Sequence, residues 1–121
     1  MQSRPPSITI ISWIFIVFGC ISLLAGLLPF GHVTFAQWMA GLKGFHLLVH
    51  VVRVLAIVAG VFMLYGRNWA RWLLVAWMVF HLVISALHST LMLLFHALIF
   101  TAILYLLFRP PASAYFDSAK S

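Results

Sequence analysis

Long apolar runs follow one another along this chain and are broken only by short clusters of polar, glycine or proline residues. A helix needs about 20 predominantly apolar residues to cross the hydrocarbon core of a bilayer. The first run lies between Arg4-Pro5-Pro6, whose prolines suit the start of a helix, and Pro29, and it predicts a span over about residues 7–28. The second predicts a span over about residues 45–65, closed by a polar turn at Gly66-Arg67-Asn68.

The third apolar run covers residues 69–108, and no Lys, Arg, Asp or Glu occurs in it after Arg71. As one continuous helix, its roughly 40 residues would be about 60 Å long, about twice the thickness of the hydrocarbon core. The run must therefore fold back on itself, and its only polar cluster near the middle is His88-Ser89-Thr90. This predicts spans over about residues 69–87 and 91–108, with Arg109-Pro110-Pro111 ending the last helix.

The composition agrees with a chain that resides in a membrane. Of the 121 residues 65% are hydrophobic and 7% are charged, and the mean hydropathy is +1.16, which excludes a soluble globular domain. A cleaved signal peptide is disfavoured, because the first apolar run is longer than a usual signal core and no A-x-A site follows it closely. We expect one transmembrane domain over residues 1–121, an all-α integral membrane four-helix bundle, with the glycine- and aromatic-rich connection 29–44 lying at one interface.

The basic residues divide unequally between the two sides of the predicted bundle. Only Lys43 lies near the span ends on one side, and the other side holds Arg4, Arg67, Arg71, Arg109 and Lys120. Because basic residues collect on the cytoplasmic side, both termini are predicted to be cytoplasmic, in a multi-pass protein of the cell inner (plasma) membrane. The net charge of +6 indicates contact with anionic lipid headgroups rather than with nucleic acid.

All six histidines fall in the outward half of this predicted topology, one of them, His32, in the first connection. His50, His81 and His96 each lie about six to eight residues from the outer end of their helix, at a similar depth of roughly 10 Å. Side chains from three helices would then meet, and we expect them to bind a haem iron, copper or zinc. In the alternative, the imidazoles only bridge helices through hydrogen bonds worth about 1 kcal/mol or less each.

Arg53 lies near the middle of the second span, on one helical face with His46 and His50. A charge at that depth costs at least about 2.5 kcal/mol, and the one acidic residue, Asp117, lies in the tail. The counter-charge is therefore expected from a bound anionic ligand, a lipid phosphate or a partner subunit. In the alternative, Arg53 donates to backbone carbonyls or extends toward water.

A histidine site without carboxylates suits haem b, copper or zinc rather than calcium or magnesium. Arg53 favours haem among these, because it repels a bare cation and attracts a propionate. The residues expected to support the cofactor are His46, Arg53, Trp77 and His88. Electron transfer is one use of such a site, and a quinone headgroup or a small anion is an alternative ligand.

A non-catalytic role is the competing hypothesis, in which the chain is an accessory or assembly subunit of a larger membrane complex or a homo-oligomer. No nucleophile with its base, phosphate loop or carboxylate pair is visible, so catalysis is not indicated. On the first span, Ser12, Gly19, Ser22 and Gly26 form a stripe of small residues suited to close helix packing. Cys20 points away from this stripe and is interpreted as an ordinary apolar residue.

The chain ends with Phe108-Arg109-Pro110-Pro111-Ala112, followed by Tyr115-Phe116. This ending resembles the tails of small uncharacterised bacterial four-span membrane proteins. The resemblance covers the layout of the spans and a few residues, and it implies no activity.

Overall fold

The computed structural model describes residues 3–27, 35–41 and 45–119, and all regular structure in these ranges is helical. In chain order the helices are α1 (Pro6–Leu27), α2 (Phe35–Gly41), α3 (Phe45–Leu64), α4 (Asn68–His88), α5 (Thr90–Phe108) and α6 (Pro110–Ser118). Four of these, α1, α3, α4 and α5, are long and apolar enough to cross a membrane. The all-α, four-span architecture predicted from the apolar pattern is therefore confirmed.

The turns between the spanning helices lie where the polar clusters predicted them. Ser89 separates α4 from α5, because its φ of −164° and ψ of 134° take it out of the helical region. Between α3 and α4, Gly66 adopts a φ of 73°, a left-handed conformation that costs glycine little. Part of the first connection forms α2, whereas His32 and Lys43 in the same connection lie outside the described residues.

Small residues bring α1 and α3 into close contact, as the stripe on the first span predicted. Ser12 is fully buried, and a Cβ added to Gly60 would lie only 2.8 Å from its carbonyl oxygen. A Cβ added to Gly19 would lie 2.6 Å from Cγ1 of Ile57. Cys20 is exposed, in agreement with its expected direction away from the contact.

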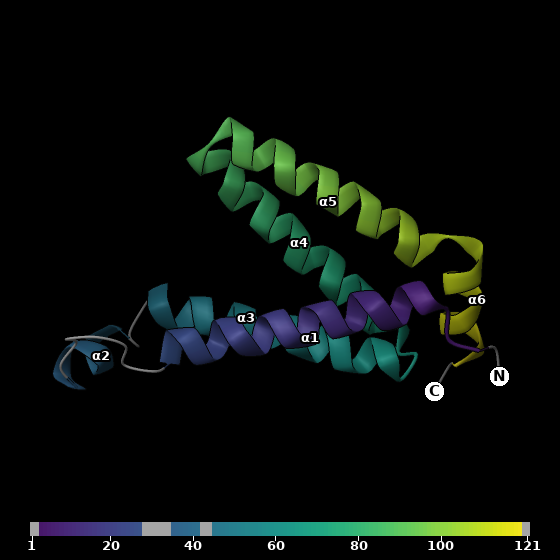
Figure 1. Ribbon diagram of the computed structural model, residues 1–121, viewed down its shortest axis with the longest axis horizontal. Coiled ribbons are helices and arrows are strands. Elements are labelled where there is room, and N and C mark those ends of the chain that lie inside the picture. Colours follow the sequence, from purple (N-terminus) through teal and green to yellow (C-terminus); the bar gives the residue numbers. More distant parts are fainter. Residues whose placement is uncertain (1–2, 28–34, 42–44, 120–121) are drawn as a thin grey trace.

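Two pairs of spanning helices lie side by side, α1 with α3 and α4 with α5, and the pairs are joined by packing of α3 against α4 (Figure 1). The pairs meet near α6 and the two chain ends, and they diverge toward the turn between α4 and α5. We call the end that carries α6 the arginine end and the end that carries the α4–α5 turn the histidine end. Because α1 makes far less contact with α5 than with α3, the bundle is open in the shape of a V.

Helix α6 covers the arginine end of the bundle and is not among the helices expected from the apolar pattern. It begins with Pro110 and Pro111 in its first turn, positions where proline costs no helical hydrogen bond. Its Phe116 is fully buried in the core, and the hydroxyl of Tyr115 donates to the carbonyl of Leu64 at 2.8 Å. The end of α3 is thereby fastened to the C-terminal segment.

Arg71 holds three helices together at this end. It is only 7% exposed, and its guanidinium lies 4.5 Å from the ring centre of Phe108 and 5.1 Å from that of Phe116. Its Nη1 also donates to the carbonyl of Leu107 at 3.4 Å and to the hydroxyl of Ser113 at 3.3 Å. A residue counted from the sequence as a topology signal is therefore also part of the core, where the positive charge lies against aromatic faces.

Candidate ligand-binding cavity

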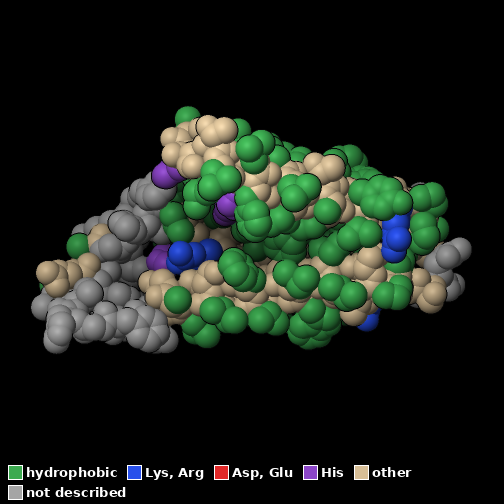
Figure 2. Space-filling model, turned by 45° about the horizontal axis from the view of Figure 1, so that its top comes forward, with side chains coloured by type: hydrophobic (Ala, Val, Ile, Leu, Met, Phe, Trp, Pro, Cys, Tyr) green, Lys and Arg blue, Asp and Glu red, His purple; other side chains and the backbone are tan. Residues whose placement is uncertain are grey.

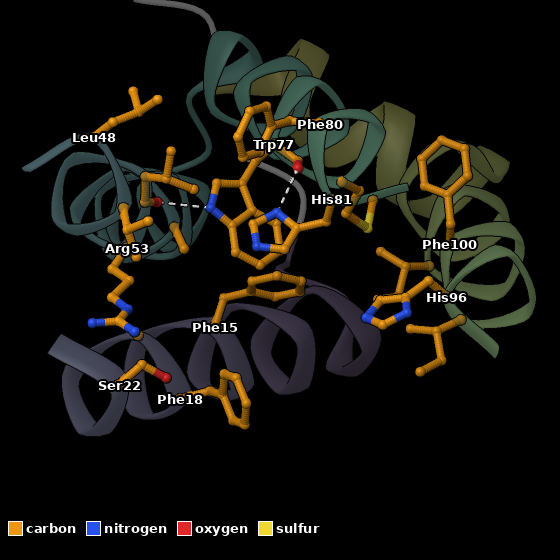
Figure 3. Close-up of a pocket in the computed structure, with 17 residues that line it drawn as sticks. Phe15, Phe18, Ser22, Leu48, Arg53, Trp77, Phe80, His81, His96 and Phe100 are labelled. Atoms are coloured by element: carbon orange, nitrogen blue, oxygen red, sulfur yellow. Dashed lines mark hydrogen bonds between the residues drawn. The ribbon is translucent and has the colours of Figure 1, made fainter. Parts of the chain in front are cut away.

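A cavity of about 370 Å³ lies between the two helix pairs. Its lining comes from all four spanning helices (Figure 3). Figure 2 shows a patch of basic side-chain atoms next to histidine at a hollow in the surface. The volume falls within the range of roughly 300 to 1,000 Å³ that is typical of small-molecule sites.

Aromatic side chains form much of the wall: Phe15, Phe18, Trp77, Phe80 and Phe100. Phe15 and Trp77 meet edge to face, with ring centres 5.4 Å apart and planes at 87°. The indole Nε1 of Trp77 donates to the backbone carbonyl of Val52 at 2.7 Å. This hydrogen bond joins α4 to α3 and fixes the ring beside the cavity.

His81 faces the cavity from α4 in one defined hydrogen-bonding state. Its Nδ1 lies 3.0 Å from the carbonyl oxygen of Trp77, four residues earlier on the same helix. A carbonyl oxygen only accepts, so the Nδ1 carries the proton and, in the neutral ring, Nε2 carries a lone pair. The imidazole also stacks on Trp77, with ring centres 3.8 Å apart.

His96 on α5 is held in the same way. Its Nδ1 lies 2.8 Å from the carbonyl oxygen of Met92 and 3.2 Å from the hydroxyl oxygen of Ser85. Because the Ser85 hydroxyl itself donates to the carbonyl of His81 at 2.8 Å, its oxygen is left to accept from His96. Two imidazoles that line the cavity therefore offer Nε2 as a hydrogen-bond acceptor.

Arg53 supplies the opposite chemistry from α3. Its Nη1 lies 3.4 Å from Nδ1 of His50, which must accept because a guanidinium only donates. A Cβ added to Gly26 would collide with this same Nη1, so the missing side chain makes room for the charge. Gly26 belongs to the last turn of α1, where the helix dipole carries partial negative charge. The end of α1 is thus a partial counter-charge, and Arg53 also lines the cavity.

The histidines expected to act as metal ligands are divided between two environments. His81 and His96 line the cavity, whereas His50 does not and instead contacts Arg53. Within the described ranges, no three His, Cys, Asp or Glu side chains come close enough to hold one metal ion. The three-helix metal centre expected from equal depth is therefore not seen in that part of the chain.

The other residues expected to support a cofactor also differ in position. Arg53 and Trp77 line the cavity. His88 is exposed at the end of α4, where its Nδ1 donates to the carbonyl of Ile84 at 2.9 Å. His46 lies in α3, but its side chain is outside the described parts.

Two features of the cavity had no clear signal in the sequence. The aromatic wall uses Phe15, Phe18, Phe80 and Phe100, which cannot be told from lipid-facing phenylalanines by composition. The place of Gly26 beside Arg53 was indicated only indirectly, by the small-residue stripe on α1 and the polar face on the second span.

The fold and the cavity together define a small multi-span membrane protein with four spanning helices. Comparisons with protein-family models, with curated proteins and with solved structures returned no match.

Proposed function

We propose that this protein binds a quinone-type headgroup, a flat ring with carbonyl or hydroxyl oxygens, in the cavity between its helix pairs. One observation carries the proposal: a hydrogen-bond donor and two acceptors from different helices border the same apolar space. Arg53 on α3 can donate to a ring carbonyl, and Nε2 of His81 or His96 can accept from a ring hydroxyl. Both redox forms of such a ring therefore find a partner.

The same groups fit a simple anion less well. An ionised anion would be attracted to Arg53 but would have no proton to donate to Nε2 of His81 or His96, whereas the reduced form of the ring donates through its hydroxyl groups. Unpaired polar groups in an apolar site are costly. The aromatic wall further favours a flat ring, because offset and edge-to-face contacts add to the burial of apolar surface.

Binding to purified protein in lipid nanodiscs tests the proposal. A short-tailed benzoquinone should quench the fluorescence of Trp77, which lines the cavity. Arg53→Met should weaken binding about 10- to 100-fold, because a hydrogen bond from a charged group is worth about 1.5 to 3 kcal/mol. Arg67→Met, at the arginine end, is the matched control and should bind like the wild type.

Three outcomes would decide against a quinone. Equal affinity of the Arg53→Met and wild-type proteins for the quinone would show that Arg53 does not donate a hydrogen bond to the ring. Saturable binding of phosphate alone at the same site would favour an anion. A stable partner subunit that is lost on Arg53→Met, with no bound quinone in the extract, would favour the accessory-subunit hypothesis.

Haem b is the second candidate, and the free Nε2 atoms of His81 and His96 are the observation that favours it. Histidines that ligate metals commonly donate their other ring nitrogen to a backbone carbonyl, as both rings do. The two Nε2 atoms would hold the iron, and Arg53 would meet a propionate. A visible spectrum of the purified protein tests this: a haem band that is lost in His81→Ala would support it, and a colourless folded protein would refute it. Copper or zinc has less support, since the described residues offer no third ligand beside these two.

A further inference from the structure

The cavity is bounded differently on its two sides. On the side of α3 and α4, the hydrogen bond from Trp77 to the carbonyl of Val52 bridges the helices beside the cavity. Between α1 and α5, the structure describes a bridge only at the arginine end, where Arg109 donates to the hydroxyl of Ser7 at 3.1 Å. The seam between α1 and α5 is therefore not fastened along the cavity in the described parts of these helices.

Residues that line the cavity at this seam are also open to the outside. Phe18 on α1 is 68% exposed and Ile99 on α5 is 41% exposed, although both belong to the cavity wall. Figure 3 places Phe18 and His96 at the side of the pocket where α1 and α5 face one another. In a membrane, an opening at this place leads to lipid chains.

On α1 and α5, the two helices of the seam, the cavity lining changes from polar to apolar along the helix. Toward the histidine end it includes Ser22 and His96, and seven residues away on the same two helices it includes Phe15 and Ile103. Seven residues of helix correspond to about 10 Å. A molecule with a polar head and an apolar tail would match this gradient with its head toward the histidine end.

We propose that the ligand is a quinone with a long alkyl or prenyl tail, which enters sideways through the seam between α1 and α5. This inference rests on the proposed quinone function. The head reaches Arg53 and His81, while the tail lies against Phe18 and Ile99 and continues into the bilayer. A ligand held in this way keeps the orientation that an amphiphile already has in a lipid leaflet.

A quinone carrying a photoreactive diazirine on its tail tests the path in nanodiscs. Mass spectrometry of the labelled protein should find the label on the seam, at residues such as Phe18, Ile99 or Ile103. Labels on Leu48 and Phe80, at the side of α3 and α4, would overturn the inference while leaving the cavity as the binding site.

A substitution at the seam gives an independent readout. Ile99→Trp should fill the opening and slow the exchange of a tritiated tailed quinone by about tenfold or more. Leu98→Trp adds the same ring to the neighbouring residue, which is 72% exposed and outside the cavity wall, and should change the rate by no more than about twofold. Equal rates for the two variants would refute the seam as the path.

A tailless benzoquinone separates failure of the path from failure of the function. If the inference holds, Ile99→Trp slows the exchange of the tailed quinone by a much larger factor than that of the tailless ring. Unchanged resistance to unfolding by dodecyl sulfate shows that the variant is folded. The tail has no site at the seam if two results are found together. Both rings would bind the wild-type protein with equal affinity, and both would exchange at equal rates in Ile99→Trp and Leu98→Trp. If neither ring binds the wild-type protein, the quinone function itself is wrong, and the entry path falls with it.

Discussion

Gly26→Ala tests whether the end of α1 provides the position that Arg53 needs. The added Cβ would collide with Nη1 of Arg53 and would lie 2.7 Å from Cε1 of His50. The guanidinium would therefore have to shift away from Gly26. Its N–H groups would then no longer be placed to donate to a ring in the cavity.

The magnitude follows from two opposing contributions. Overpacking of a helix contact costs about 1 to 3 kcal/mol, with the lower end expected here because a guanidinium is the flexible end of a side chain. Alanine in place of glycine returns up to about 1 kcal/mol of helix propensity. The net change in stability is therefore expected to be small. The affinity for a quinone should nevertheless fall by about tenfold, since a displaced guanidinium loses the alignment of a charge-assisted hydrogen bond to the ring that is worth about 1.5 to 3 kcal/mol.

The assay compares quinone affinity and resistance to unfolding by dodecyl sulfate in the same preparations. Ala25→Leu is the matched control, because Ala25 is the neighbouring residue on α1 and is exposed. It should change neither quantity appreciably. If Gly26→Ala keeps wild-type affinity while Arg53→Met loses it, the position of the guanidinium against α1 is not what prepares the site.

Two further predictions concern contacts between the helices. Arg71→Met should destabilise the fold by about 2 to 4 kcal/mol, because it removes a buried charge-assisted contact with Leu107 and the interaction with two aromatic rings. The quinone affinity of the folded protein should not change, and a loss of affinity without a loss of stability in the detergent titration would contradict this structural role. Trp77→Phe removes the hydrogen bond to Val52 and should lower the free energy of unfolding by about 0.6 to 1.7 kcal/mol in the same titration. It should also abolish most of the fluorescence quenching by bound quinone, and full quenching in this variant would show that another tryptophan reports binding.

The spans were predictable because burial in lipid demands long apolar runs. The third run had to break near its middle to fit the bilayer, and its polar cluster at residues 88–90 indicated where. The V-shaped opening was not predictable. Leu98 and Ile99 are both large apolar residues, and only the path of α5 decides that one faces outward while the other lines a cavity. A hydropathy pattern does not distinguish lipid from an internal apolar space.

The candidate site was predictable in part, for the same kind of reason. Equal depth placed His50, His81 and His96 in one layer of the membrane, but a layer extends across the whole bundle. His50 turns to Arg53 beside α1, whereas the other two reach the cavity. Arg71 shows the converse: its position near a helix end indicated topology, and its burial depends on α6, whose apolar residues are too few to form a recognisable run.

The cover that α6 forms over the arginine end has a consequence for exchange. If a ligand enters at the seam, α6 prevents it from continuing through the arginine end of the bundle. It would therefore return to the bilayer on the side from which it came. The rate of ligand exchange in such a protein would be set by the residence time of the ligand. A protein that receives the ligand would have to take it from the lipid beside α1 and α5.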